Sequence, residues 1–538
     1  MELGLWVALV LVAASSLYWS LRGTAFGALL LTIVKLIACK GRRAAGALTG
    51  LWFPISVEEL TGPRGPKLLT KMLQHGQHLP LDVSVLSVQH LRKDIKDGVK
   101  GDKALLKVTF SKEVPNLPGT FFVKFNLQSF GAMRLLVATS DVCLCEALFY
   151  HHLAEEAAEV VKTPKCFFVD FNRLTGEFCL LTEALHFGGP AAVSTADASA
   201  SSFELRPMKH RIRDPATLEE QLLFIETGAR LHCKFWADNQ VLRDMPKFYE
   251  THREMWVLCS LSGRFGLGQT VRRTLRGQAE VNEDWMTWDV PGDLKGKEWE
   301  LINDMPAILT SLAQDLDMAA FGHNDLTTDN AFYWKDCDHL KLGLFDWQQS
   351  CVNNVAQEWA WNWHFLEPEF LTEHEERLIG ELLVTYERLG RPISRKKFLH
   401  AYVLGTVQMF VFGGGGLQLL MAELHSKGIF QSLVPNDPRC RMSDSTMDEN
   451  LREKLVGAEM TRRTFTNCCN IMRRHDFASA WLRWKAERTK GARHVPPRGT
   501  VGGGRCQRAA TTTSCCGSQH IDASKACSSW GSEGEWKV

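Results

Sequence analysis

The chain has 538 residues and a formal net charge of +1, from 62 Lys and Arg against 61 Asp and Glu. This length predicts about two to four structural units. A charge so nearly balanced provides no strongly basic face, which argues against nucleic acid as a partner.

The first predicted element is an apolar helix over residues 3–21, which carry no charge. A segment of this length and character suffices to cross a bilayer. Only Glu2 precedes it, whereas several positive residues follow it, namely Arg22, Lys35, Lys40, Arg42 and Arg43. By the positive-inside rule, we expect residues 1–44 to anchor the protein in a membrane, with the rest of the chain on the cytosolic side.

Two alternatives to an uncleaved anchor are a cleaved signal peptide and a buried core helix. The signal peptide is disfavoured because the start of the chain has no basic region. A second apolar stretch, GTAFGALLLTIV, either re-enters the membrane or lies on it. The sixteen cysteines fit the cytosolic interpretation, because most lie singly in apolar runs such as VCLCEALF and no Asn-x-Ser/Thr sequon occurs.

The rest of the chain divides into four segments. Residues 45–185 indicate a mixed α and β region, and HFGGPAAVSTADASASS at 186–202 indicates a flexible linker or insertion. Residues 203–486 are mostly helical by their spacing of apolar residues, as in EEQLLFIETGARLHCKFW and EERLIGELLVTYERLG. Residues 487–538 are rich in Gly, Ser, Thr and Arg and are predicted to be disordered. The cysteines of this tail lack zinc-ligand spacing.

A strand in the first of these segments carries a lysine. In LPGTFFVKFNL the apolar residues alternate around Lys124. Such a charge usually lies on the solvent face of a sheet. It can instead contact nucleotide phosphates, a role that requires an acidic counter-ion on a helix. The next predicted helix, DVCLCEALFYHHLAEEAAEV, supplies Glu146 for that purpose.

A predicted hairpin follows that helix. It runs through KCFFVDFNRLTGEFCLLTEAL with FNRLTG as its turn, and the chain leaves the sheet at Glu183, Ala184 and Leu185. In a bilobal kinase that exit is the hinge, whose backbone binds adenine. We therefore expect these three residues to contact ATP.

The most informative stretch is FGHNDLTTDNAFYW at 321–334, followed by Asp346 in LGLFDWQQS. An Asp on a rigid loop can accept the proton of an attacking hydroxyl, and an Asn and a second Asp can hold Mg²⁺. Asp325, Asn330 and Asp346 fit these roles, and His323, the second candidate catalytic residue, would brace the loop. The alternative is that NDL and TDN are ordinary turn sequences.

In this order the motifs resemble the aminoglycoside phosphotransferase and choline kinase superfamily, and within it the ecdysteroid-kinase-like (CHK-kinase-like) branch. The matching segments, spread over residues 51–421, are FPISVEELTG, LPGTFFVKFN, CEALFY, ARLHCKFW, HNDLTTDN and LFDWQQS. The resemblance implies an α+β, bilobal, protein-kinase-like fold with a small β-rich N-lobe and a larger helical C-lobe. It also implies MgATP between the lobes.

By this resemblance, Asp325 is the catalytic base, Asn330 and Asp346 bind Mg²⁺, and Lys124 and Glu146 form the phosphate-orienting ion pair. Three features depart from the family pattern. Asn324 stands where the branch usually has Gly, although Asn tolerates unusual backbone angles. The segment KDIKDGVKGDKALLKV, expected to cover the nucleotide, has only Gly98 and Gly101. The acid expected after the metal-binding Asp is assigned to Glu358, in a sequence that differs from the family's.

The sequence thus predicts a small-molecule kinase that phosphorylates a hydroxyl. One alternative is a membrane-anchored pseudokinase or scaffold, given the glycine-poor segment. A protein kinase is a weaker alternative because no Ala-Pro-Glu segment follows Asp346. The acceptor classes left open are a lipid, a sterol and a choline-like head group. Trp236, Trp361 and Trp363 either hold such a cation or belong to the core of the C-lobe.

Overall fold

The computed structural model describes residues 53–92, 101–126, 142–185, 216–248, 290–411 and 424–493, apart from short gaps in these ranges and a few isolated residues. The predicted anchor at 3–21 and the linker at 186–202 lie outside these residues. Within the described part of the chain, no helix is long and apolar enough to cross a membrane. The anchor and its orientation remain predictions.

The N-lobe is built on one antiparallel sheet of five strands in the order β1-β2-β3-β5-β4. The strands are β1 (Val85–Arg92), β2 (Gly101–Phe110), β3 (Thr120–Asn126), β4 (Cys166–Phe171) and β5 (Phe178–Glu183). Alternate residues of β3, namely Phe121, Val123 and Phe125, are buried in a core with α3 (Val57–Thr61) and α4 (Gly65–His75). Because strand side chains alternate between faces, Lys124 belongs to the opposite face.

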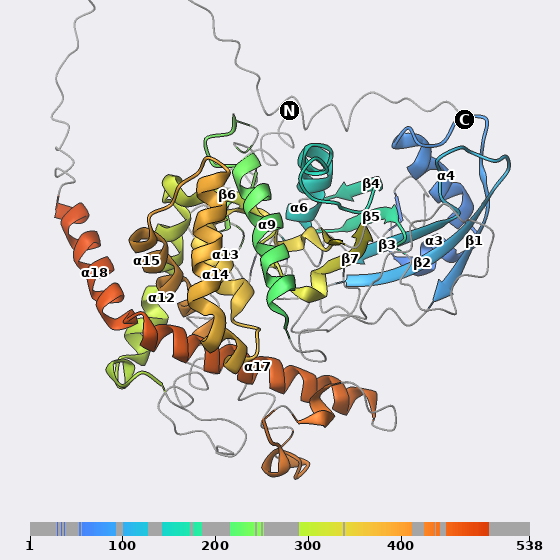
Figure 1. The fold of residues 1–538 in the computed structure, drawn as a ribbon. Helices are drawn as coiled ribbons and strands as arrows, with labels where there is room; N and C mark the ends of the chain where they lie inside the picture. Colours follow the sequence, from blue (N-terminus) through green and yellow to red (C-terminus); the bar gives the residue numbers. More distant parts are fainter. Residues whose placement is uncertain are drawn as a thin grey trace, which may run out of the picture. The chain divides into compact units, whose positions relative to one another are not determined.

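The opposite face of the sheet meets the helix that carries Glu146. This helix, α6 (Val142–Leu148), continues through a π-turn (Phe149–Leu153) into α7 (Ala154–Ala157). It contacts β4 and β5, and Figure 1 shows it beside that edge of the sheet. The predicted hairpin is confirmed, since β4 and β5 pair antiparallel.

The C-lobe is a bundle of helices around a large apolar core. Its helices are α9 (Leu218–Lys234), α12 (Glu298–Ala313), α13 (Val355–Trp363), α14 (Pro368–Arg388), α15 (Arg395–Gly405), α17 (Glu449–Arg474) and α18 (Phe477–Arg493). Helix α9 begins at a capping box made by Thr217 and Glu220, which satisfies backbone donors that a helix start leaves open. It packs against α14 (Figure 1).

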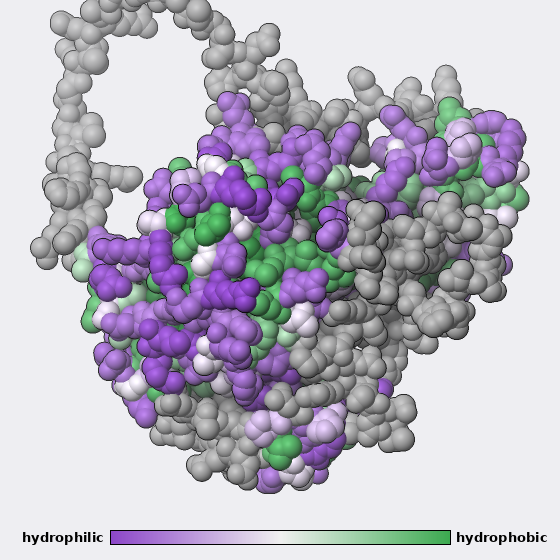
Figure 2. Space-filling view, viewed as in Figure 1, coloured by the Kyte–Doolittle hydropathy of each residue, from purple (hydrophilic) through white to green (hydrophobic). Residues whose placement is uncertain are grey.

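Hydrophilic residues cover most of the helical part on the face drawn in Figure 2, with apolar residues between them. This pattern follows from amphipathic helices that turn their apolar stripes inward. The nine cysteines in the described residues are free thiols, and most are buried, as the sequence predicts.

The chain divides into two units, one that ends at Lys485 and one that begins at Ala486. Helix α18 continues to Arg493, so the predicted tail boundary at 487 falls inside a helix.

Two short sheets in the C-lobe carry the central motif. Strands β6 (Ala319–Gly322) and β9 (Cys351–Asn354) pair with each other, as do β7 (Ala331–Asp336) and β8 (His339–Leu344). The loop from His323 to Asn330 leaves β6 and enters β7. Because β8 returns opposite β7, Asp346 lies next to the end of that loop.

Candidate active site

Lys124 and Glu146 form a buried ion pair between the sheet and α6. The Nζ of Lys124 lies 2.8 Å from Oε2 of Glu146, and the two side chains are 2% and 1% exposed. Neither charge would be stable alone at such depth, so each requires the other. The pairing predicted from the sequence is therefore formed.

Lys124 also reaches across to the C-lobe. Its Nζ lies 2.6 Å from Oδ1 of Asp346. Burial alone would lower the pKa of Lys124, but the carboxylates of Asp346 and Glu146 outweigh burial and raise it. The lysine is therefore a fixed cation that joins the helix acid to the metal-binding candidate.

A second lysine, which the sequence analysis did not assign, lies at the same cluster. Lys103 on β2 pairs in register with Lys124 on β3. Its Nζ is 3.7 Å from Oδ2 of Asp346, and its side chain is 7% exposed. Burial lowers the pKa of Lys103, and the charge of Asp346 offsets this in part.

Backbone contacts fix the position of Asp346. The N–H of the preceding residue, Phe345, donates to the carbonyl of Asn330 at 3.0 Å. The Phe345 carbonyl in turn lies 3.0 Å from Nε2 of His323. Asp346 itself adopts φ 62° and ψ 62°, a left-handed conformation that non-glycine residues seldom adopt. Strain of this kind concentrates at functional sites.

The residue after Asp346 ties this loop to the helix of Glu146. Trp347 stacks on Phe149, with ring centroids 3.7 Å apart. Its indole N–H donates to Oγ1 of Thr163 at 3.0 Å. The stacked pair keeps α6 close to Asp346, and so keeps Glu146 within reach of Lys124.

Asp325 is held by two donors. Its Oδ2 accepts from Nδ2 of Asn330 and its Oδ1 from Nε1 of Trp361, each at 2.9 Å. Nδ2 of Asn330 also donates to the Asp325 carbonyl at 2.9 Å. Since the amide nitrogen of Asn330 is engaged, its Oδ1 is the atom left for a cation.

The residues at the start of the loop are buried and support it. His323 is fully buried and braces the loop through the Phe345 carbonyl, whereas a catalytic role for it stays a prediction. Asn324 adopts φ 55°, a left-handed conformation that Asn tolerates better than most residues other than Gly. Its Nδ2 donates to the Cys351 carbonyl at 2.9 Å and its Oδ1 accepts from Nδ2 of Asn353 at 2.7 Å.

A buried chain of hydrogen bonds supports the loop from below. Oε1 of Glu358, on α13, accepts from the backbone N–H of Asn324 at 2.7 Å. Oε2 of Glu358 lies 2.8 Å from Nε2 of His232, whose Nδ1 lies 2.6 Å from the Tyr386 hydroxyl. Glu358 thus orients the backbone before Asp325, which is a positioning role.

The three predicted hinge residues lie where the chain leaves β5. Oε1 of Glu183 accepts from the backbone N–H of Lys165 at 2.9 Å. This contact secures the end of β5 to the start of β4. Ala184 and Leu185 follow as half-buried, non-strand residues, and 186–215 lies outside the described residues. The contact of these three residues with ATP stays a prediction.

The predicted magnesium site offers two oxygen-bearing side chains, Asn330 and Asp346. Across the part of the chain that the structure describes, no group of three or more His, Cys, Asp or Glu side chains could hold a metal ion. Two oxygen-bearing side chains can suffice for Mg²⁺, which takes one or two protein ligands and completes its shell with phosphate oxygens and water. The side chain of Asp346 is 25% exposed, so it is partly accessible from solvent.

The three tryptophans proposed as a cation site have separate environments. Trp363 is fully buried and Trp236 is 6% exposed, both in the large C-lobe core, and the Arg391 guanidinium lies over the Trp236 ring. Trp236 and Trp363 therefore belong to the core of the C-lobe, as the second interpretation predicted. Only Trp361 reaches the site, through Asp325.

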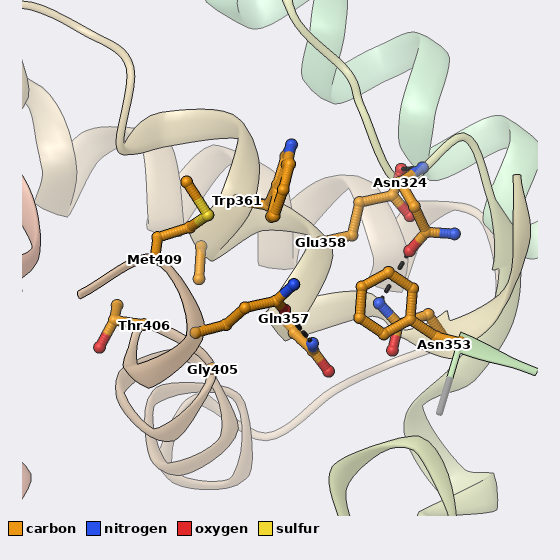
Figure 3. Close-up of a pocket in the computed structure, with 11 residues that line it drawn as sticks. Asn324, Asn353, Gln357, Glu358, Trp361, Gly405, Thr406 and Met409 are labelled. Atoms are coloured by element: carbon orange, nitrogen blue, oxygen red, sulfur yellow. Dashed lines mark hydrogen bonds between the residues drawn. The ribbon is translucent and has the colours of Figure 1, made fainter. Parts of the chain in front are cut away.

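Trp361 also lines a pocket beneath the loop. Figure 3 shows Gln357, Glu358 and Trp361 of α13 around it, facing Gly405, Thr406 and Met409. Its lining is rich in neutral amides. Within the described residues, Oδ1 of Asn353 and Oε1 of Gln357 are buried there without a hydrogen-bond partner.

Lys103 and His232 lie at the site but were not predicted from the sequence. Lys103 could have been found from GDKALLKV, where lysines alternate with apolar residues opposite the strand of Lys124. His232 lies in ARLHCKFW, but nothing in its spacing connects it with Glu358, which is 126 residues away. That contact joins α9 to α13 and depends on how both helices pack against β6.

No family model matches the chain, and no curated protein matches it. The solved structures similar to it include the microcompartment-associated aminopropanol kinase, at 9% identity over 76% of this chain and 98% of that chain, with a TM-score of 0.37. An ethanolamine kinase from Plasmodium vivax matches at 13% identity over 79% and 100% of the two chains, with a TM-score of 0.37. A choline kinase from Cryptosporidium parvum matches at 9% identity over 77% and 97%, with a TM-score of 0.37.

Aminoglycoside phosphotransferases are also among the similar solved structures. These neighbours come from the superfamily that the motifs resemble. At such identities and TM-scores, we base the proposal below on the contacts of the site and not on these likenesses.

Proposed function

We propose that the protein is an ATP-dependent phosphotransferase that moves the γ-phosphate to a hydroxyl of a small molecule. One observation carries the proposal: Lys124 contacts Glu146 and Asp346 at once, next to the loop that presents Asp325 and Asn330. A Lys–Glu pair of this kind orients nucleotide phosphates, and protein kinases need both this pair and an Asp that binds Mg²⁺ for phosphoryl transfer.

The roles follow from the chemistry of each group. Bound Mg²⁺ would neutralise phosphate charge, and Asn330 and Asp346 would hold it through oxygen atoms. Lys124 would contact the phosphates. Asp325, fixed by Asn330 and Trp361, would accept the proton of the acceptor hydroxyl. Trp361, which donates to this base, also lines the small amide-rich pocket.

The first test measures thermal unfolding of the full-length protein with ATP, with and without Mg²⁺. The proposal predicts stabilisation that requires Mg²⁺ and is lost in Asp346→Ala. Ligand at a hundred times its Kd would stabilise by about 2.7 kcal/mol. Asp82→Ala, which removes an exposed carboxylate of the N-lobe, is the control and should respond like the wild type.

The result also decides between active kinase and pseudokinase. If the folded wild type shows no Mg²⁺-dependent stabilisation, the loop from His323 to Asn330 has no role in binding MgATP. The result would then favour the pseudokinase alternative. If stabilisation is seen, acceptors would be tested first among ethanolamine, choline and aminopropanol, the small alcohols in the names of the similar kinases. The lipid and sterol alternatives would be tested next.

A further inference from the structure

The buried charge cluster at the site contains one more cation than the proposed roles use. Lys103 and Lys124 supply two positive charges, and Glu146 and Asp346 supply two negative ones. Buried charges are tolerated when each is paired with an opposite charge. With all four groups ionised, the cluster as described is neutral.

That balance changes when the site binds its ligands. The proposed function places Mg²⁺ on Asp346, whose carboxylate then serves the metal as well as the lysines. Within these four groups, Glu146 would then be the one carboxylate that serves the lysines alone. A polyphosphate beside the metal is the anion that would restore the balance, and a lysine ammonium binds phosphate as a compact charge with three donors.

The position of Lys103 on its strand is suited to this contact. It lies near the start of β2, and the register places it directly across from Lys124. The chain that precedes it, residues 93–100, contains a single glycine. A kinase loop that covers phosphates is normally rich in glycine. Glycine lets a backbone approach a ligand closely, and a lysine at the start of β2 would supply phosphate donors from a side chain instead.

We propose that Lys103 binds the phosphates of the nucleotide directly, as a second phosphate-binding lysine beside Lys124. This inference rests on the proposed function, because it requires a nucleotide in the site. The competing explanation is structural: Lys103 only neutralises Asp346. A neutralising role alters folding stability whatever the ligand, whereas a phosphate contact alters affinity according to the phosphates that the ligand carries.

The experiment compares Lys103→Met, Lys103→Arg and Lys107→Met in the full-length chain. Lys107 lies on the same strand and is exposed, so its substitution removes a positive charge without changing the cluster. Calorimetric titration with Mg²⁺ present would measure the affinity for adenosine, ADP and ATP. Far-UV circular dichroism would establish that each variant is folded.

Lys103→Met is expected to weaken ATP binding roughly tenfold to a hundredfold, the loss of one charge-assisted hydrogen bond. Adenosine binding should be unchanged. Lys103→Arg should recover part of the loss, and Lys107→Met should match the wild type. Because adenosine and ATP are compared within one variant, a general loss of folded protein would lower both affinities together.

Two outcomes overturn the inference alone. In the first, Lys103→Met binds ATP as the wild type does. In the second, it loses adenosine and ATP affinity equally, which identifies Lys103 as a structural neutraliser. If the wild type itself binds no nucleotide, the proposed function fails and the inference fails with it. These results are distinguishable because only the last one involves the unmodified protein.

Discussion

Asn324 illustrates how a residue other than glycine can occupy a left-handed position in a tight loop. The backbone before Asp325 is left-handed there, at φ 55°. Glycine adopts this conformation without cost, and Asn adopts it more readily than most other residues. The side-chain amide adds hydrogen bonds to Cys351 and Asn353 that glycine could not make. We therefore regard Asn324 as compatible with an active loop.

The chemical role of Asp325 can be tested separately from nucleotide binding. Asp325→Asn keeps the size of the side chain but removes the basic carboxylate. We expect phosphate transfer to fall roughly a hundredfold to ten-thousandfold, the usual contribution of a general base. MgATP should still stabilise the variant, because Asp325 is not among the groups that contact Lys124. Transfer would be followed with radiolabelled ATP and the three small alcohols.

Asp317→Asn serves as the control for that experiment, since it changes an exposed carboxylate of the C-lobe that pairs with Lys397. It should transfer phosphate at the wild-type rate. If Asp325→Asn also did so, Asp325 would not be the base, and the loop would need another explanation.

At this scale the sequence predicted the contact that depends on motif order, the ion pair of Lys124 and Glu146, which is formed. The hydrogen bond from Asn330 to Asp325 was not predicted. Nor could the sequence predict that Trp361 donates to Asp325. That contact depends on how α13 is rotated against the loop, and the apolar pattern of a helix rich in tryptophan does not specify which ring faces the site.

At the scale of elements, the close approach of β6 to α13 sets the geometry under the loop. Gly322 ends β6, and a Cβ added there would lie 1.8 Å from Oε2 of Glu358 and 2.8 Å from Nε2 of His232. Both of those groups are buried and hydrogen-bonded to each other. The strand can approach the helix this closely only because residue 322 has no side chain.

Gly322→Ala should therefore destabilise the protein. We expect a loss of about 1–3 kcal/mol in the free energy of unfolding, as for overpacked cores. The displaced Glu358 would also disturb the backbone at Asn324, so phosphate transfer should decrease together with stability. Differential scanning calorimetry and the transfer assay would measure the two effects.

Gly380→Ala is the matched control because it introduces the same methyl group elsewhere in the C-lobe. Gly380 lies inside α14, and an added Cβ would meet nothing within 4 Å. Ala is the better helix former by roughly 0.5–1 kcal/mol, so this variant should be more stable than the wild type. Equal effects of the two substitutions would contradict the close approach described above.

At the scale of the whole molecule, local patterns specified most elements but not their contacts. Alternation in TFFVKFN predicted β3, and helical spacing predicted α9 and α14. Contacts between residues far apart in the sequence were predicted only where a motif implied them. The contact between α14 and α17, for example, is made through Glu375 and Arg474, which lie 99 residues apart. Neither residue belongs to a motif that would connect them.

Glu375 joins three helices of the C-lobe. Its carboxylate accepts from Nε of Arg474 at 2.7 Å and from the Tyr402 hydroxyl at 2.9 Å, and Nε2 of His475 lies 3.3 Å away. Burial alone would raise the pKa of Glu375, but His475 and Arg474 outweigh burial and lower it. A carboxylate with a lowered pKa stabilises the folded state above its unfolded pKa, and this contribution disappears as pH falls through the folded pKa.

The whole C-lobe should therefore lose stability in acid partly through this residue. An unfolded Glu has a pKa of about 4.3, so the loss should begin near that pH and continue below it. In Glu375→Gln this part of the acid dependence is absent. The unfolding temperature of the variant should be lower than that of the wild type at neutral pH, and the difference should narrow on acidification.

Glu376→Gln provides the comparison, because Glu376 is the next residue of α14 and is 68% exposed in its pair with Arg395. Exposed pairs contribute about 0–1 kcal/mol, so this variant should follow the wild-type curve closely. A difference between wild type and Glu375→Gln that stayed constant from neutral pH to about pH 3 would show that the carboxylate is protonated throughout. The contact of α14, α15 and α17 around Glu375 would then depend on neutral hydrogen bonds and not on charge.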